Sequence, residues 1–242
     1  MKKHLLTLAC LAFTSFNSFA EWSIQAKLGP EQKSYTLTIN DTYEGTADIG
    51  GLAVGISAVN PNGWFIDIEN SFGDDEIEGF FGASEAIIER NDTSISVGKS
   101  VDGLVLFGGY KITESEVSCD DCLMMNSTHP VLSTDFKFVT TGFFAGLAKT
   151  FPLAKNHFTN LALAAGMMDG EYDPENGEGG SNSSLGYSVT ASYIFKANNN
   201  WTLSTGVKAQ AYEYDELNDN TNNVTTANEE FTTLFLKASY TL

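Results

Sequence analysis

The chain has 242 residues, of which 42% are hydrophobic, so it can form one large domain or two small ones. Its net charge of −18 excludes nucleic acid as a partner, because phosphate binding requires clustered positive charge. No apolar run after residue 20 reaches the length of about 20 residues that a membrane-spanning helix needs.

The first 20 residues have the pattern of a secretory signal peptide. Lys2 and Lys3 form the charged start, Leu5 to Phe13 the short apolar core, and Ser18-Phe19-Ala20 the cleavage site. We therefore predict a signal peptide over residues 1–20 and one exported domain over residues 21–242. That domain has 11 basic and 31 acidic residues, so its net charge is −20.

Alternation of apolar and polar residues along the mature chain predicts half-buried β-strands. The first segment starts at Trp22 and is interrupted at Gly29-Pro30; Tyr35, Leu37 and Ile39 then alternate with reversed parity. Two interpretations are open. Either one long first strand contains a bulge, or a short N-terminal piece precedes the first strand.

Further strands follow, separated by turn sequences such as Asn60-Pro-Asn-Gly63 and Asp102-Gly103. The predicted segments are Leu52–Ala58, Trp64–Phe72, Ile95–Val97, Leu104–Ile112, Phe136–Phe151, Leu161–Met167, Leu185–Phe195, Trp201–Ala211 and Phe231–Leu242. In Phe136–Phe151 the apolar residues fall on both faces, so the pattern does not fix its orientation. In Phe231–Leu242 one face is wholly apolar and the other mostly polar, which is typical of a strand that closes a barrel.

The connections between these segments alternate in length. Short connections follow residues 59, 100, 151 and 196, and long acidic ones begin near residues 73, 115, 171 and 215. This asymmetry is typical of a transmembrane barrel with short turns on one side and long loops on the other. We predict an all-β, antiparallel up-and-down barrel of about ten strands, each of ~9–11 residues, with 8 or 12 strands as alternatives.

Charged residues that alternate with the apolar face must point into the lumen, because on the lipid face each costs roughly 2–4 kcal/mol near the midplane. The predicted lumen charges are Asp67, Glu69, Lys111, Lys208 and Lys237. We expect them to pair across a narrow lumen, because barrels of about eight strands are filled by side chains and open porins have about 16 strands. Aromatic residues near the short turns predict a girdle: Trp22, Trp64, Tyr193, Phe195, Trp201 and Tyr240.

The mature chain contains two cysteines, Cys119 and Cys122. In an exported protein this spacing predicts a disulfide that closes a loop. The two aspartates between them disfavour the thiolate that a redox motif needs, and a zinc site would need further ligands, of which only His129 is near. Cys10 raises a lipoprotein alternative, but Thr7 stands where a lipobox has Leu.

A soluble secreted β-sandwich is the alternative to a barrel, because its strands also alternate. The outer face of a sandwich should be rich in charge. Here the polar faces of the strands over residues 185–195 and 201–211 carry Gly, Ser and Thr, which suit a narrow lumen better.

The signal peptide, the alternating strands over residues 22–242, the loop asymmetry and the terminal Tyr240-Thr-Leu242 resemble those of small Gram-negative outer-membrane β-barrel proteins. This group holds the OmpA-like, OmpW-like and opacity-type barrels, which usually end on an aromatic residue rather than on Leu. The resemblance is architectural and carries over no functional residues. It implies a monomer in the cell outer membrane, with the barrel insertion machinery, outer-membrane lipid and lipopolysaccharide as partners.

The sequence indicates no catalytic centre, metal site or cofactor. The omptin proteases, which resemble this chain in strand count, use Asp pairs with a His near the outer rim. Here the mature histidines are His129, in a long loop, and His157, in a turn at the other end. We therefore expect no enzyme activity. Acidic loops that reach lipopolysaccharide through divalent cations are compatible with the carboxylate chemistry of Ca²⁺ and Mg²⁺.

The expected function is a structural or surface-interaction role in the outer membrane. A small gated pore is the alternative, and a surface hydrolase that depends on His129 is the third.

Overall fold

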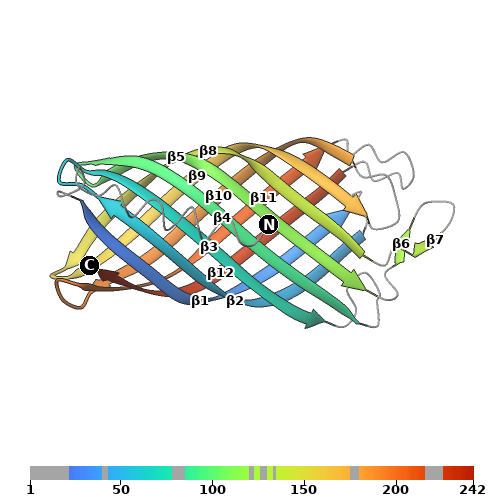
Figure 1. The fold of residues 1–242 in the computed structure, drawn as a ribbon, viewed down its shortest axis with the longest axis horizontal. Helices are drawn as coiled ribbons and strands as arrows, with labels where there is room; N and C mark the ends of the chain where they lie inside the picture. Colours follow the sequence, from blue (N-terminus) through green and yellow to red (C-terminus); the bar gives the residue numbers. More distant parts are fainter. Residues whose placement is uncertain are drawn as a thin grey trace, which may run out of the picture.

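The structure, a computed structural model, describes residues 22–39, 43–77, 85–119, 123–125, 130–132, 135–174, 180–215 and 226–242. Ten long strands in these ranges form one closed barrel (Figure 1). The barrel strands are β1 (Ser23–Ile39), β2 (Tyr43–Val59), β3 (Trp64–Ile77), β4 (Ala86–Val101), β5 (Leu104–Cys119), β8 (Asp135–Ala154), β9 (His157–Pro174), β10 (Gly180–Lys196), β11 (Trp201–Asp215) and β12 (Thr226–Thr241). A separate two-stranded sheet, β6 (Leu123–Met125) and β7 (Pro130–Leu132), lies in the connection between β5 and β8.

Every barrel strand is antiparallel to its neighbours, and β1 pairs with β12 to close the ring. The predicted all-β, up-and-down barrel of ten strands is therefore confirmed, and the alternatives of 8 and 12 strands are wrong. Closure leaves no strand edge with unpaired backbone groups.

Tight turns form one end of the barrel. They cover residues 60–63, 102–103, 155–156 and 197–200. Asp102 and Gly103 have φ values of 51° and 74°, as a two-residue hairpin turn of type I′ requires. We call this the turn end, at the left of Figure 1, and the opposite end, where β6 and β7 lie, the loop end.

β1 is one uninterrupted strand, so the interpretation of one long first strand is confirmed, whereas the bulge at Gly29-Pro30 and the separate N-terminal piece are wrong. Its register with β2 is constant from Ser23, opposite Val59, to Ile39, opposite Tyr43. The register with β12 is also the same on both sides of the interruption. The reversed parity of the apolar residues therefore has a cause other than a bulge.

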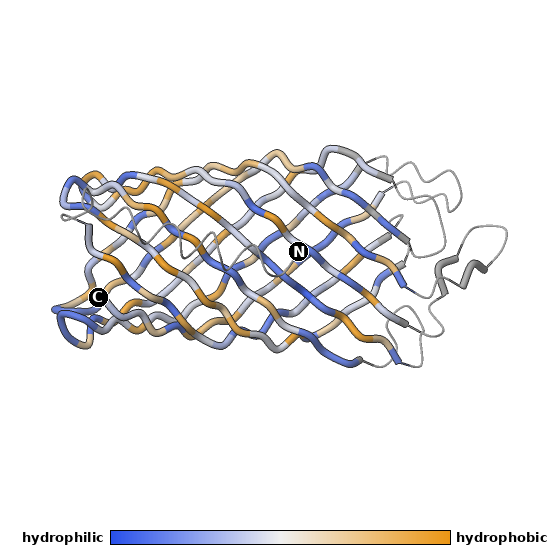
Figure 2. Tube along the Cα trace, viewed as in Figure 1, coloured by the Kyte–Doolittle hydropathy of each residue, from blue (hydrophilic) through white to orange (hydrophobic). Residues whose placement is uncertain are grey.

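Along β1 the apolar residues move from the outer face of the strand to its inner face. Toward the turn end of β1, Leu28 faces outward and is 54% exposed, whereas toward the loop end Tyr35 and Leu37 face the interior and are fully buried. β12 behaves in the same way, since Leu236 is outward and 54% exposed and Phe231 is buried inside. Figure 2 shows hydrophobic and polar residues succeeding one another along the strands.

The outward-facing apolar side chains of the turn-end part form a band around the barrel, which we call the apolar belt. Its members include Leu28, Val54, Ile66, Ile68, Ile95, Val97, Leu106, Ile112, Leu147, Leu163, Val189, Leu203, Leu234 and Leu236. Nearer the loop end, with Ile87 an apolar exception, most outward positions are polar and largely acidic: Gln32, Ser34, Asp48, Asp74, Glu116, Asp169, Glu171, Glu213 and Glu230.

The strands are longer than predicted. They run from 14 residues in β3 to 20 in β8, against the ~9–11 that a tilted spanning strand requires. β3 and β4 extend into the stretch 73–89, and β9 and β10 into the stretch 171–184, both of which had been assigned to loops. These extensions lie beyond the apolar belt, where the apolar residues of each strand face the interior. The prediction assumed that the same face of a strand is apolar along its whole length, so it ended the strands too early.

The same change explains the apolar residues on both faces of Phe136–Phe151. Phe136 and Phe138, near the loop end, are buried inside the barrel, whereas Phe143 faces outward and is 74% exposed. At the turn end of the belt four residues of the predicted girdle are exposed: Trp64, Tyr193, Trp201 and Tyr240.

Several predictions fall outside the described residues. These are the signal peptide, Cys122 and His129; of Cys119 only the backbone at the end of β5 is described. The disulfide therefore stays a prediction. Within the described ranges, no helix is long and apolar enough to cross a membrane.

Closure of the ring requires glycine at position 29. A Cβ atom on Gly29 would lie 1.9 Å from the carbonyl oxygen of Leu236 on β12. We expect Gly29→Ala to lower the free energy of unfolding by about 1–3 kcal/mol, measured by urea titration of the refolded protein in lipid vesicles. Gly50→Ala is the control, because the nearest atom to a Cβ there is 3.9 Å away. Equal stability of the two variants would contradict the β1–β12 register.

Candidate functional site in the barrel lumen

The five predicted lumen charges lie inside the barrel. Lys237 Nζ lies 2.8 Å from Glu69 Oε1, and Asp67 pairs with Lys27 of β1. Lys111 donates a hydrogen bond of 2.7 Å to the hydroxyl of Tyr212. Lys208 differs from the other four, because it makes no hydrogen bond or ion pair with any residue that the structure describes, although it lines the lumen.

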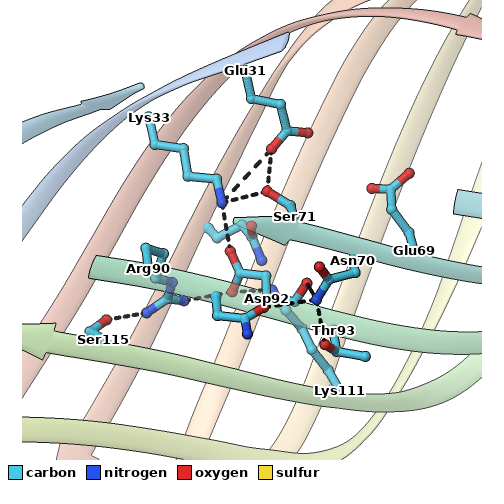
Figure 3. A network of polar contacts seen from close by, with 12 residues as sticks. Glu31, Lys33, Glu69, Asn70, Ser71, Arg90, Asp92, Thr93, Lys111 and Ser115 are labelled. Carbon is cyan, nitrogen blue, oxygen red and sulfur yellow. Dashed lines mark hydrogen bonds and ion pairs between the residues drawn. The ribbon is translucent and has the colours of Figure 1, made fainter. Parts of the chain in front are cut away.

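Asp92 of β4 is the centre of the charge network (Figure 3). Its Oδ2 accepts a hydrogen bond of 3.0 Å from Lys33 Nζ, and its Oδ1 accepts one of 2.9 Å from Arg90 Nη2. Lys111 Nζ lies 3.6 Å from the same Oδ1. Three cations from β1, β4 and β5 therefore meet at one carboxylate. Loss of that carboxylate would leave them close together inside the barrel without compensation.

Glu31 joins this group to the charges nearer the turn end. Ser71 Oγ accepts a hydrogen bond of 2.6 Å from Lys33 Nζ and donates one of 2.5 Å to Glu31 Oε2. Lys237 Nζ lies 3.1 Å from Glu31 Oε1. Because Lys237 also pairs with Glu69, the ion pairs form one connected network across β1, β3, β4, β5 and β12.

Glu229 of β12 lies nearer the loop end and is fully buried. Its Oε1 accepts hydrogen bonds of 3.1 Å from Tyr35 Oη and 2.8 Å from Ser115 Oγ. Its Oε2 accepts one of 2.6 Å from Tyr214 Oη. Arg90 Nη1, 3.5 Å from Oε1, supplies the compensating positive charge. Arg90 therefore connects Glu229 with Asp92.

Apolar and aromatic side chains fill the lumen on the loop-end side of this network. We call this packing the outer layer; its main members are Tyr35, Leu37, Ile49, Ile88, Val117, Phe136, Phe138, Tyr212, Tyr214 and Phe231. Each is at most 3% exposed. They come from seven of the ten barrel strands, so side chains from most of the ring pack together on the loop-end side of the network.

Two adjoining cavities of about 210 Å³ each lie on the turn-end side of the outer layer. Both are lined by Ser94, Lys111, Thr190, Lys208 and Gln210. The one we call the ion-pair cavity is also lined by the charges of the network: Glu31, Lys33, Glu69, Asp92 and Lys237. The other, the lysine cavity, has an apolar wall of Phe107, Phe144, Ala162, Ala164, Gly166 and Met168.

Six further charged residues of the lumen were not predicted from the sequence: Lys27, Glu31, Lys33, Arg90, Asp92 and Glu229. Leu28 faces outward, so its neighbour Lys27 faces the lumen. In an uninterrupted β1, every second residue faces the same side, so Glu31 and Lys33 face the lumen as well. The interruption assumed at Gly29-Pro30 hid this signal. Arg90 and Asp92 lie between the predicted loop over residues 73–89 and the predicted strand Ile95–Val97, and Glu229 ends the predicted loop over residues 215–229, so no face was assigned to these three.

The described residues contain one histidine, His157, which begins β9 at the turn end. Its ring stacks on Phe195 with centroids 4.9 Å apart, and Nδ1 forms a hydrogen bond with Tyr193 Oη. It lies far along the barrel from the acidic groups near the loop end. In the part of the chain that the structure describes, no group of three or more His, Cys, Asp or Glu residues is placed to hold a metal ion.

No protein-family model matches the sequence, and no curated protein is similar to it. Solved structures do share the architecture. The outer membrane protease OmpT from Escherichia coli is 9% identical, with a TM-score of 0.62 over 91% of this chain and 97% of that one. The translocator domain of the autotransporter NalP from Neisseria meningitidis is 10% identical, with a TM-score of 0.51 over 99% and 94%.

The β domain of the Bordetella autotransporter BrkA is 11% identical, with a TM-score of 0.50 over 92% of this chain and 100% of that one. At such identities the likeness concerns the fold alone. The chain has the fold of bacterial outer-membrane β-barrels.

Proposed function

We propose that the protein is an integral barrel of the cell outer membrane with a structural or surface-interaction role. The apolar belt carries this proposal. The largest exposed apolar patch on a soluble monomer covers about 300–600 Å², whereas the belt runs around the whole barrel, with Leu106 60% and Val189 53% exposed. A lipid bilayer around the barrel would keep such a surface out of water. The turn end then faces the periplasm and the loop end the exterior.

The outer layer supports a structural role over general diffusion. Its buried aromatic side chains pack between the two cavities and the loop end, which supports a filled lumen rather than an open channel. The ion pairs around Asp92 and Glu229 join four of the strands, β1, β4, β5 and β12, which would hold the barrel in one shape. A ring that closes on itself needs no second copy, so we expect a monomer.

The acidic part of the barrel outside the belt is the proposed interaction surface. Glu116, Glu171, Glu213 and Glu230 are outward and exposed there. Direct contact with the phosphates of lipopolysaccharide would be repulsive, so we propose that divalent cations are shared between these carboxylates and the lipid phosphates. The barrel insertion machinery is the other expected partner.

A small gated pore is the second candidate. Toward the turn end the lumen has small side chains that remain partly exposed, such as Ser96, Ser192 and Ser204, whereas the side chains of the outer layer are buried. Displacement of that layer would then open the pore. No observation on the described residues favours a surface hydrolase.

If the belt lies in a membrane, the loss of unfolding free energy caused by an outward-facing charge should depend on where along the strand that charge is placed. Leu236→Arg, within the belt, should lower the free energy of unfolding in lipid vesicles by about 2–4 kcal/mol. Thr232→Arg, on the same face of β12 beyond the belt, should cost about 0–1 kcal/mol. Urea titration measures both. A similar cost at the two positions would contradict the placement of the membrane at the belt.

Closure by the outer layer predicts a low conductance that one inward substitution raises. Wild-type protein in planar bilayers should show little conductance, and Phe138→Ala should increase it, because it removes a fully buried ring from the layer. Phe143→Ala is the control, since this ring lies on the same strand but faces outward. Large stable channels from the wild type would favour the pore, and equal conductance of the two variants would show that the layer is not the barrier.

A further inference from the structure

Lys208 stands outside the ion-pair network of the lumen. That network contains five cations, Lys27, Lys33, Arg90, Lys111 and Lys237, and five carboxylates, Glu31, Asp67, Glu69, Asp92 and Glu229. Each of the carboxylates lies within 4.0 Å of a cation other than Lys208. Among the described residues, the half-buried Lys208 therefore has no carboxylate partner of its own. A counter-charge that accepts a charge-assisted hydrogen bond from its ammonium group would be stabilising.

The lysine cavity lies beside this charge and differs from its neighbour in composition. The ion-pair cavity has three carboxylates in its wall, Glu31, Glu69 and Asp92. The lysine cavity has none, and Lys111 and Lys208 are its charged residues. Its electrostatic character is therefore that of an anion site.

The rest of the lysine cavity combines polar and apolar walls. Ser94, Thr190 and Gln210 place hydroxyl and amide groups near the two lysines. Away from the lysines, Phe107 and Phe144 and several alanines form the wall. The cavity volume of about 210 Å³ far exceeds the ~10–15 Å³ that one water needs on the same measure.

From this arrangement we propose that the lysine cavity binds a small organic carboxylate. The carboxylate lies between Lys111 and Lys208 and supplies a counter-charge for Lys208 through charge-assisted hydrogen bonds. The apolar part of the ligand lies against Phe107, Phe144 and the alanines of β9. This inference is independent of the proposed surface role, because it concerns the interior alone.

Access to the site is from the turn end. Several lumen-facing side chains between the cavity and that end are short and partly exposed, among them Ser96, Ser192 and Ser204. In the other direction Tyr212 and the remainder of the outer layer are buried. In the proposed orientation the ligand therefore enters from the periplasm and does not pass to the exterior.

Wild-type protein gives the first test, by isothermal titration calorimetry of the refolded full-length mature chain in detergent with sodium benzoate as the probe. We expect saturable binding to one site. Benzyl alcohol has a similar shape without the charge and should bind at least about tenfold more weakly, the loss expected when a charged hydrogen-bond partner is removed. Sulfate should compete poorly, because it leaves the apolar wall uncovered.

Two pairs of variants then separate the charge from the cavity. Lys208→Met should weaken benzoate binding at least about tenfold, whereas Lys99→Met, which removes a lysine on the outer surface beside Trp64, should not. Ala164→Leu should abolish binding by filling the cavity, whereas Ala145→Leu, which changes an exposed outward position of β8 that does not line the cavity, should not. Heat-modifiable migration on a denaturing gel establishes that each variant is folded.

Three results would overturn the proposal. These are absence of benzoate binding to the wild type, equal affinity for benzyl alcohol, and full binding by a folded Ala164→Leu variant. If sulfate binds as well as benzoate and needs only Lys208, the site holds an inorganic anion and the carboxylate assignment is wrong. None of these results bears on the acidic outer surface, so failure here and failure of the surface role remain distinct.

Discussion

The two-residue period of a β-strand is the constraint on which this structure depends. Each residue of a closed barrel faces either the interior or the surroundings, and no register slip occurs in β1 to change that assignment. Outward positions are apolar up to one level and polar beyond it, as Leu236 and Glu230 show on β12. Where the outside is polar the interior must provide the packing, so aromatic residues such as Phe138 and Phe231 fill it.

The electrostatic network lies at the level where the apolar residues change sides. Arg90 contacts Asp92 below and Glu229 above, and its guanidinium lies 4.0 Å from the ring centroid of Phe231. It therefore couples the ion pairs to the outer layer. On the turn-end side the packing is looser, and small residues on β9 and β10 leave the lysine cavity. One lumen thus contains a tightly packed part and, in our proposal, a part that accepts a ligand.

The sequence was sufficient for the architecture within the apolar belt, where alternation and turn chemistry agree. It was insufficient beyond the belt, because an outward acidic residue in a long strand looks like a loop residue when no partner strand is known. Asp92 and Glu229 were lost for this reason. Asp67, Glu69, Lys111, Lys208 and Lys237 were found because apolar neighbours revealed their parity. That Lys208 lacks a partner depends on distances between strands, which a single sequence does not contain.

The exchange of apolar faces along one uninterrupted strand can be measured directly on β1. Single nitroxide labels at positions 28, 34 and 35, in protein with Cys119 and Cys122 replaced by serine and reconstituted in lipid vesicles, would report their surroundings by power-saturation electron paramagnetic resonance. We expect lipid-dissolved oxygen to relax the label at position 28 and a water-soluble nickel chelate to relax that at position 34. The label at position 35 should be immobile and reached by neither. Oxygen access at position 35 equal to that at position 28 would place both on the lipid face and contradict the account.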